Sequence, residues 1–354
     1  MLFSVLSFLI AFLAVLWLHP KMVRIAREKG ITDNPDRRKL QREPVPVLGG
    51  VSVFFGIVLG IGSAVPFIEV FGMAFILTLL TLMLYVGSMD DILGLTPRLR
   101  FLIEILAVLV AIFLGKYGID NFYGLWGVWG IPQWIGVPLT LVASVGIINA
   151  VNLIDGVDGL SSGYCILACV VFGAYFYFTD DFLMLVLATA CIGALIPFFY
   201  HNVFGNRLKM FIGDGGTLLM GMVLSIFVLR VLDVKEEMPW FMQTTERTFG
   251  LIPFTLAVLA IPVFDTLRVM TRRMWSGHSP FKPDKTHLHH AFIGLGFSHI
   301  ATTLSILTLN SLIVLGWFLL YRSGCSVDVQ LYFVVVSALL FTLGVYLIAR
   351  KYRK

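Results

Sequence analysis

The segment 149–160, Asn-Ala-Val-Asn-Leu-Ile-Asp-Gly-Val-Asp-Gly-Leu, places amides, carboxylates and glycines directly after an apolar run. Polar side chains at the depth of a membrane are costly, so they usually face a water-filled cavity and indicate a functional site. The two glycines allow the backbone to turn tightly and to approach a ligand. We therefore expect Asn152, Asp155 and Asp158 to line a binding site. A plain loop with Asx turns and helix caps is the alternative.

Two adjacent carboxylates, Asp90 and Asp91, follow another apolar run. Negative charge is disfavoured at the C-terminus of a helix, so helix stability does not account for the pair. A carboxylate can act as a base, and Mg²⁺ is usually held by one or two carboxylates together with substrate phosphates. We predict that both residues are catalytic, with a solvated helix end as the alternative.

The glycine-rich segment 211–217, Phe-Ile-Gly-Asp-Gly-Gly-Thr, is predicted to open a helix. Successive backbone N–H groups in such a turn form an anion-binding concavity, and the helix N-terminus adds positive potential. Asp214 is then placed to hold a metal ion on a phosphate, and Lys209 stands just upstream. An N-cap aspartate in a flexible turn would give the same pattern.

The segment 282–290, Lys-Pro-Asp-Lys-Thr-His-Leu-His-His, gathers three histidines and two lysines. A structural zinc site is disfavoured, because no thiolate or other ligand set accompanies His287, His289 and His290. Imidazole and ammonium groups are good donors to phosphate, so a phosphate-binding loop fits better. A basic loop without a ligand remains the alternative.

Taken together, these segments supply carboxylates, an amide, a glycine-rich turn and a basic loop. Phosphoryl transfer needs this set of groups: a metal-bridged diphosphate, cationic contacts and a positioned nucleophile. The expected cofactor is Mg²⁺, with Mn²⁺ as an alternative. Because the segments follow apolar runs, one substrate is expected to be water-soluble and the other a lipid.

The composition identifies a membrane protein. The chain has 354 residues, of which 58% are hydrophobic and 13% charged, and its mean hydropathy is +0.91. A spanning helix needs roughly 20 mostly apolar residues, which predicts an all-α, polytopic bundle of about 11 spans in a single catalytic domain, 1–354. The expected spans lie near 2–19, 48–69, 72–89, 99–118, 135–153, 160–179, 182–200, 214–233, 248–267, 300–321 and 329–349.

Charge predicts the orientation of these spans. With the N-terminus outside and the C-terminus cytoplasmic, most of the 26 Lys and Arg residues fall in inside loops, as the positive-inside rule requires. The polar segments then share the cytoplasmic side, where loops 20–47, 90–98, 149–160, 200–214 and 268–299 are expected to build the site. Since the basic residues gather in short loops, no nucleic-acid partner is expected.

In their order and spacing, these segments resemble those of the polyprenyl-phosphate N-acetylhexosamine-1-phosphate transferase family. The resemblance rests on Asp90-Asp91, 149–160, 211–217 and His287–His290, and it extends to Pro-Val-Leu-Gly-Gly at 46–50. It covers nearly the whole chain. The histidine segment resembles the branch that transfers GlcNAc-1-phosphate to undecaprenyl phosphate. The branch that transfers phospho-MurNAc-pentapeptide usually has a lysine soon after the Asp-Asp pair, whereas residues 92–95 here are Ile-Leu-Gly-Leu.

The resemblance implies roles for the matched residues. Asp214 and Asn152 would hold Mg²⁺ on the pyrophosphate of UDP-GlcNAc, while Asp90 and Asp91 would position or deprotonate the lipid phosphate. The remaining expected substrate contacts are Asp155, Asp158, Arg42, Lys209, His287, His289 and His290.

The implied partners are a UDP-N-acetylhexosamine, undecaprenyl phosphate and the lipid bilayer, with a homodimer as one form the enzyme could take. The implied place is the bacterial cytoplasmic (inner) membrane, at the first membrane step of cell-surface polysaccharide synthesis. Two other classes stay open from the residues. An intramembrane prenyltransferase also uses two Asp-rich motifs, and a transporter can have broken helices, although such breaks lie near the midplane and often come with repeats.

Overall fold

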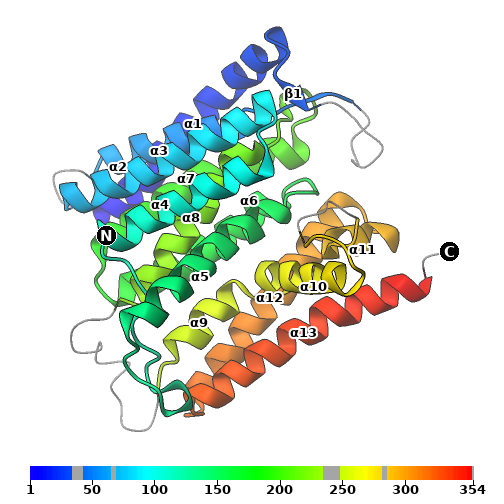
Figure 1. Ribbon diagram of the computed structural model, residues 1–354. Helices are drawn as coiled ribbons and strands as arrows, with labels where there is room; N and C mark the ends of the chain where they lie inside the picture. The colour runs from blue at the N-terminus through cyan, green and yellow to red at the C-terminus, as the bar shows by residue number, and fades with distance from the viewer. Residues whose placement is uncertain (34–42, 65–68, 234–247, 281–284, 353–354) are drawn as a thin grey trace.

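The computed structural model describes residues 1–33, 43–64, 69–233, 248–280 and 285–352 (Figure 1). This part of the chain is mostly α-helical, as expected. The α-helices are α1 (Leu2–Glu28), α2 (Gly49–Gly62), α3 (Val70–Leu93), α4 (Pro97–Phe113), α5 (Gln133–Leu153), α6 (Leu160–Phe178), α7 (Phe182–Phe204), α8 (Gly213–Val231), α9 (Leu251–Val258), α10 (Ala260–Trp275), α11 (Leu288–Gly294), α12 (His299–Arg322) and α13 (Val327–Tyr352).

Short elements connect the helices near the ends of the bundle. The strands β1 (Thr32–Asp33) and β2 (Val45–Pro46) pair antiparallel, with Thr32 opposite Pro46. Two 3₁₀ turns, η2 (Leu125–Gly127) and η3 (Asn206–Leu208), complete the described elements. The strand pair is a small exception to the expected all-helical fold, and it brings the segment after α1 beside the start of α2.

Eight of the described helices are long and apolar enough to cross a membrane: α1, α3, α5, α6, α7, α8, α12 and α13. The pair α9 and α10 passes only when taken together, and it is bent by 76°. Helix α2 has 14 residues, which at about 1.5 Å per residue is shorter than the roughly 30 Å hydrocarbon core. Every expected segment contains a helix, but the expected count of about 11 spans is not confirmed.

Helix α8 lies at the centre of the bundle and is buried along almost its whole length. It packs against α2, α3, α5, α6 and α9. The residues after its first turn are almost all apolar, and a helix that is apolar on every face is stable only inside a protein or a membrane. Its first turn carries Asp214, so this deeply buried helix begins at a predicted site residue.

The break between α9 and α10 has an identifiable cause. Pro262 lacks the N–H that would bond to the carbonyl of Val258. That carbonyl instead accepts hydrogen bonds from Tyr164 Oη (2.7 Å) and Asn310 Nδ2 (3.0 Å), while Asn310 Oδ1 accepts the N–H of Ile261 (3.0 Å). Backbone groups freed inside a membrane must find such partners. The side chains from α6 and α12 therefore stabilise the bend, which directs α10 away from α9.

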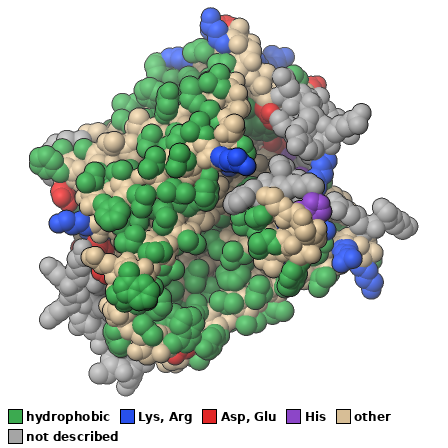
Figure 2. All heavy atoms as spheres, in the orientation of Figure 1, with side chains coloured by type: hydrophobic (Ala, Val, Ile, Leu, Met, Phe, Trp, Pro, Cys, Tyr) green, Lys and Arg blue, Asp and Glu red, His purple; other side chains and the backbone are tan. Residues whose placement is uncertain are grey.

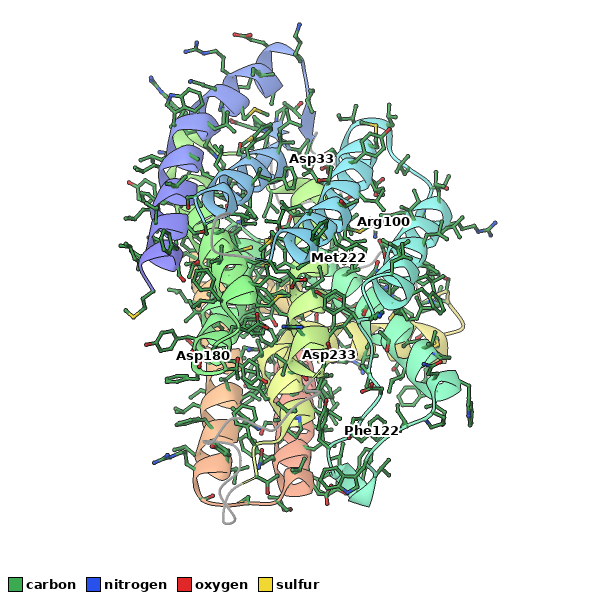
Figure 3. All side chains as sticks on the ribbon, turned by 90° about the vertical axis from the view of Figure 1, so that its left-hand side faces the viewer. Asp33, Arg100, Phe122, Asp180, Met222 and Asp233 are labelled. Atoms are coloured by element: carbon green, nitrogen blue, oxygen red, sulfur yellow. The ribbon has the colours of Figure 1, made fainter. Side chains whose placement is uncertain are left out.

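The surface separates into an apolar side and polar ends. Figure 2 shows hydrophobic side chains over much of one lateral face, and exposed ones such as Leu106, Val142 and Leu340 agree with contact to lipid. In Figure 3, Asp33 and Arg100 lie on one side of Met222, and Asp180 and Asp233 lie on the other. The bundle thus has two charged ends with an apolar middle, as a membrane requires.

Candidate active site

The Asp-Asp pair lies at the end of α3 and makes two different sets of contacts. The Asp90 carboxylate accepts the N–H of Leu95 (2.8 Å) and Arg100 Nη1 (3.1 Å). The Asp91 carboxylate accepts the backbone N–H groups of Asp214 (2.9 Å) and Gly215 (3.1 Å). The acid pair and the glycine turn, both expected to belong to the site, are adjacent, but the amides expected to cradle a phosphate are bound by Asp91.

The glycine turn is shaped by this close approach. Gly213 has φ +71°, and an added Cβ there would overlap the carboxylate of Asp91. Glycine alone adopts this left-handed conformation at little cost. Opposite the turn, Phe211 donates its N–H to the carbonyl of Pro46 (2.8 Å), and Gly50 donates to that of Ile212 (2.8 Å). These bonds pair the glycine turn with the 46–50 segment, to which the resemblance also extends.

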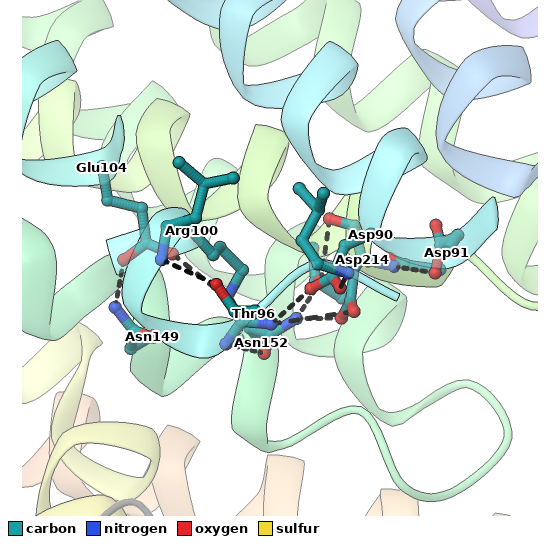
Figure 4. A network of polar contacts seen from close by, with 12 residues as sticks. Asp90, Asp91, Thr96, Arg100, Glu104, Asn149, Asn152 and Asp214 are labelled. Atoms are coloured by element: carbon teal, nitrogen blue, oxygen red, sulfur yellow. Dashed lines mark hydrogen bonds and ion pairs between the residues drawn. The ribbon is translucent and has the colours of Figure 1, made fainter. Parts of the chain in front are cut away.

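Arg100, on α4, lies among the acidic residues (Figure 4). Its guanidinium approaches Asp90 (3.1 Å), Glu104 (3.4 Å) and Asp214 (3.7 Å), and it donates to Asn152 Oδ1 (3.4 Å). Close charges of one sign repel strongly where water is scarce. Arg100 therefore compensates a cluster of carboxylates contributed by α3, α4 and α8.

Asn152 connects the segment 149–160 to the start of α8. Its Nδ2 donates to Asp214 Oδ1 (2.5 Å) and to Thr217 Oγ1 (2.8 Å). One helical turn earlier, Asn149 donates to Glu104, which is fully buried. The structure thus brings together the two residues predicted to hold a metal ion, and it adds a second amide–carboxylate pair that the sequence did not single out.

Asp158 lies in a contact network between the α5–α6 loop and two other segments. It accepts hydrogen bonds from Lys209 Nζ (2.6 Å) and His299 Nδ1 (2.9 Å). Burial alone would raise the pKa of Asp158, but the bonds from His299 and Lys209 outweigh it and lower that pKa below its usual value. Asp158 is therefore a carboxylate at neutral pH, and Lys209 is not a free phosphate contact but is shared with it.

The loop containing Asp158 is also held in place by a hydrogen bond to Asn202 of α7. Asn202 Oδ1 accepts the N–H of Gly159 (2.6 Å), and its Nδ2 donates to the carbonyl of Met210 (2.9 Å). One buried side chain therefore joins the α5–α6 loop to the segment that leads into α8. Amides that bridge two loops in this way fix the distance between them, because both ends of the side chain are committed.

The three histidines follow α10 in the chain and lie beside the α5–α6 loop. His287 Nδ1 lies 3.0 Å from Asp265 Oδ2, and the ring of His289 packs against Gly156, where an added Cβ would overlap it. Burial, together with neighbouring His290 and His287, lowers the pKa of His289 well below its usual value. His289 is therefore neutral at pH 7 and does not supply the positive charge expected of this loop.

A single cavity of about 560 Å³ brings the polar segments together. Its lining includes every predicted site residue except Arg42, which lies outside the described residues: Asp90, Asp91, Asn152, Asp155, Asp158, Lys209, Asp214, His287, His289 and His290. The sequence analysis missed Asn202, Arg273 and His299, which also line it. It missed Glu104 and Asp265 too, although ionisable residues inside apolar runs indicate function by default.

The donor set at Asp214 fits a hard divalent cation. Mg²⁺ prefers oxygen ligands and commonly uses one or two carboxylates, leaving the other positions to water and substrate phosphates. Asp90 and Asp214 both approach Arg100, and the Asn152 amide oxygen lies beside them. Within the described ranges, no three His, Cys, Asp or Glu side chains are arranged as a ready-made metal site.

The central part of the chain is similar to a known protein family. Residues 73–232 match the family described as glycosyl transferase family 4. An undecaprenyl-phosphate alpha-N-acetylglucosaminyl 1-phosphate transferase of Escherichia coli (strain K12) is 30% identical over 280 residues, covering 78% of this chain and 72% of that protein. The chain belongs to glycosyl transferase family 4.

A second relative in glycosyl transferase family 4 extends the similarity almost from end to end. A probable undecaprenyl-phosphate N-acetylglucosaminyl 1-phosphate transferase of Bacillus subtilis (strain 168) is 28% identical over 340 residues, or 94% of this chain and 89% of that protein. The family resemblance derived from the polar segments is thereby confirmed. The similarity also reaches α11 and the C-terminal helices, which lie beyond the family match at 73–232.

Proposed function

We propose that the protein transfers GlcNAc-1-phosphate from UDP-GlcNAc to undecaprenyl phosphate and releases UMP. The observation that carries this proposal is the cavity that all the predicted polar segments share. Its volume lies within the roughly 300–1,000 Å³ typical of small-molecule sites. Two relatives named for transfer of N-acetylglucosaminyl 1-phosphate to undecaprenyl phosphate support it, and they favour GlcNAc over phospho-MurNAc-pentapeptide. The prenyltransferase and transporter readings gain no support.

In the proposed reaction, an oxygen of the lipid phosphate attacks the phosphorus that carries the sugar. The bond from that phosphorus to the bridging oxygen breaks, and UMP leaves with the electron pair. Asp90 and Asp91 would orient the lipid phosphate. Both carboxylates already accept two hydrogen bonds each. A carboxylate can only accept a hydrogen bond, so a further direct contact would be to a protonated oxygen of the lipid phosphate, which the carboxylate would position or deprotonate.

The proposed cofactor is Mg²⁺, with Mn²⁺ as an alternative, held by Asp214 and Asn152. When bound, it would neutralise the diphosphate, whose negative charge otherwise repels the attacking phosphate. Around it, Asp155, Asp158, Lys209, His287, His289 and His290 would contact the nucleotide-sugar, and Arg42 is proposed as a further contact. Lys209 can bond both Asp158 and a phosphate, because an ammonium group has three donors.

We further propose that the chain forms one catalytic domain, 1–354, in the bacterial inner membrane, as a monomer or a homodimer. Counting α2, α4 and the bent pair α9–α10 as spans would bring the eight long helices to about 11. The N-terminus would then lie outside and the C-terminus in the cytoplasm, in agreement with the bias of basic residues. The cavity would open to the cytoplasm, where UDP-sugars are made.

Nucleotide release by the purified protein tests this function. Incubation with UDP-GlcNAc, undecaprenyl phosphate and Mg²⁺ should release UMP, and omission of the lipid phosphate or chelation of the metal ion should abolish the release. Release of UDP would mean ordinary glycosyl transfer and would contradict the mechanism. Parallel reactions with other UDP-N-acetylhexosamines would rank the sugars.

A further inference from the structure

A buried carboxylate on α10 is fully engaged by groups of the histidine segment. Asp265 lies in the second turn of α10, after the α9–α10 break, and is 2% exposed. Its Oδ1 accepts Arg268 Nη2 (2.5 Å) and Nε (3.2 Å). Its Oδ2 accepts His287 Nδ1 (3.0 Å) and the N–H of Leu288 (3.1 Å). No part of this carboxylate is left for solvent, so its contacts define its role.

Arg268 continues the same network into the rest of the loop. Its Nη2 also donates to the carbonyl of Thr286 (2.7 Å), and its guanidinium stacks on the ring of Tyr346 of α13 (4.7 Å). Residues 286–288 are therefore held to α10 by hydrogen bonds that Asp265 accepts and one that Arg268 donates. A buried ion pair contributes little net stability, so this network is better explained by the placement of what it holds.

His287 is the group of this network that reaches the cavity. Its side chain lines the cavity and is 5% exposed, and with Nδ1 facing Asp265, its Nε2 is buried without a hydrogen-bond partner in the described chain. Buried polar atoms normally have a partner. A carboxylate on one ring nitrogen fixes the tautomer and orientation of a histidine, leaving the other nitrogen for a ligand.

We propose that Asp265 is a positioning residue that keeps the proton of His287 on Nδ1 and so presents Nε2 to the bound nucleotide-sugar. The inference rests on the proposed function, since that function supplies the ligand. Asp265→Asn keeps the shape but has one acceptor oxygen, which we expect to stay on Arg268, because that charged guanidinium donates to it twice. The amide nitrogen then faces His287 and donates to Nδ1, so the ring proton moves to Nε2, which can no longer accept.

The decisive comparison is UMP release by wild-type protein, Asp265→Asn and a matched control, Asp181→Asn. The control loses the same charge from another ion pair, because Asp181 accepts Arg230 Nε (2.6 Å) and the N–H of Met184 at the opposite end of the bundle. We expect kcat/KM to fall roughly 10–100-fold for Asp265→Asn, as for loss of a group that orients a ligand, and to change less than about twofold for Asp181→Asn. Equal kcat/KM in the two variants would overturn the proposal.

A double-mutant cycle separates positioning from a general effect on folding. Because Asp265 acts through His287, Asp265→Asn should change kcat/KM less than about twofold when His287→Ala is already present. An equal loss in both backgrounds would assign Asp265 a structural role only. Melting temperatures of all variants provide the folding control. Wild-type protein that releases no UMP would refute the proposed function, whereas an active wild type with an unimpaired Asp265→Asn variant would refute this inference alone.

Discussion

Individual acidic residues at the site differ in what binds them, and this difference predicts different consequences of mutation. Asp91 accepts two amides of α8, and Asp90 accepts a backbone amide and Arg100. Asp214 accepts the side chain of Asn152 and lies 3.7 Å from Arg100. Of these three acids, Asp214 alone has no backbone donor bound to its carboxylate in the described residues, which leaves it the most freedom to bind a cation.

Asp214→Asn is expected to lower UMP release more than about 100-fold. Loss of a group that merely supports a metal ligand typically costs about 10–100-fold, and this change removes the charge of the proposed ligand itself. The measurement is UMP release as a function of Mg²⁺ concentration, with the melting temperature as a control for folding. Near-normal release at any Mg²⁺ concentration would contradict the proposed metal site.

Asp158 makes stability depend on pH in a defined direction. Its pKa is lower in the folded protein than the usual value near 4 because Lys209 and His299 bind it. Such a group stabilises the folded state above the unfolded pKa, and this contribution is lost as the pH falls through the folded pKa. The melting temperature of wild type should therefore exceed that of Asp158→Asn at pH 7, and the difference should shrink below about pH 4. A constant difference from pH 7 to pH 3 would contradict this assignment.

The site residues at the ends of apolar runs could be predicted from the sequence, but the roles of two buried acids, Glu104 and Asp265, could not. Glu104 and Asp265 lie inside apolar runs that form helices, whereas the predicted site residues lie at the ends of such runs. Glu104 is bound by Arg100 and by Asn149, which is 45 positions away along the chain. Asp265 is bound by Arg268 and by His287, which is 22 positions away. Pairing over such separations is decided by packing, which periodicity does not encode.

At the scale of elements, the site depends on how closely the α5–α6 loop meets the histidine segment. An alanine at Gly156 would place its Cβ on the ring of His289, whereas an alanine at Gly146, in the middle of α5, would meet no atom within 4 Å. This difference makes the two glycines a matched pair, one in α5 and the other in the loop that follows it.

Gly156→Ala should lower UMP release by roughly 10–100-fold, since displacement of a binding group by about 1 Å can have effects of this size. Gly146→Ala should retain wild-type release and keep or raise the melting temperature, because alanine favours a helix. Both variants are compared in the same assay. Equal activity of the two would show that the contact between Gly156 and His289 has no functional role.

The bend between α9 and α10 is a feature of the helices that the sequence pattern does not predict. The segment 248–267 was expected to be one span, but the helix breaks at Leu259 and α10 continues to Trp275. Proline alone does not require a bend of 76°. The bend also needs partners for the freed backbone groups, and these come from Tyr164 and Asn310 on other helices.

For the whole molecule, the proposed topology places the two ends of the bundle on opposite sides of the membrane. Cys325 lies between α12 and α13, and the other three cysteines are buried. The exposed Ser276 directly follows α10, on the chain segment that leads to the histidines. If the cavity opens to the cytoplasm, an impermeant thiol reagent should label Cys325 in intact cells. It should not label a Ser276→Cys variant that also carries Cys325→Ser until the membrane is permeabilised. The reverse pattern would invert the proposed topology.

The sequence by itself determined the membrane character, the helical class and the identity of the polar segments. These depend on runs of apolar residues and on short clusters, which are local along the chain. The tertiary structure decided that Asp91 binds the N-terminus of α8, that Arg100 lies among the carboxylates and that Asp265 holds His287. These contacts join residues from different helices, and the packing of α3 and α5 on α8, and of α4 and α10 on α5, brings those helices to one cavity.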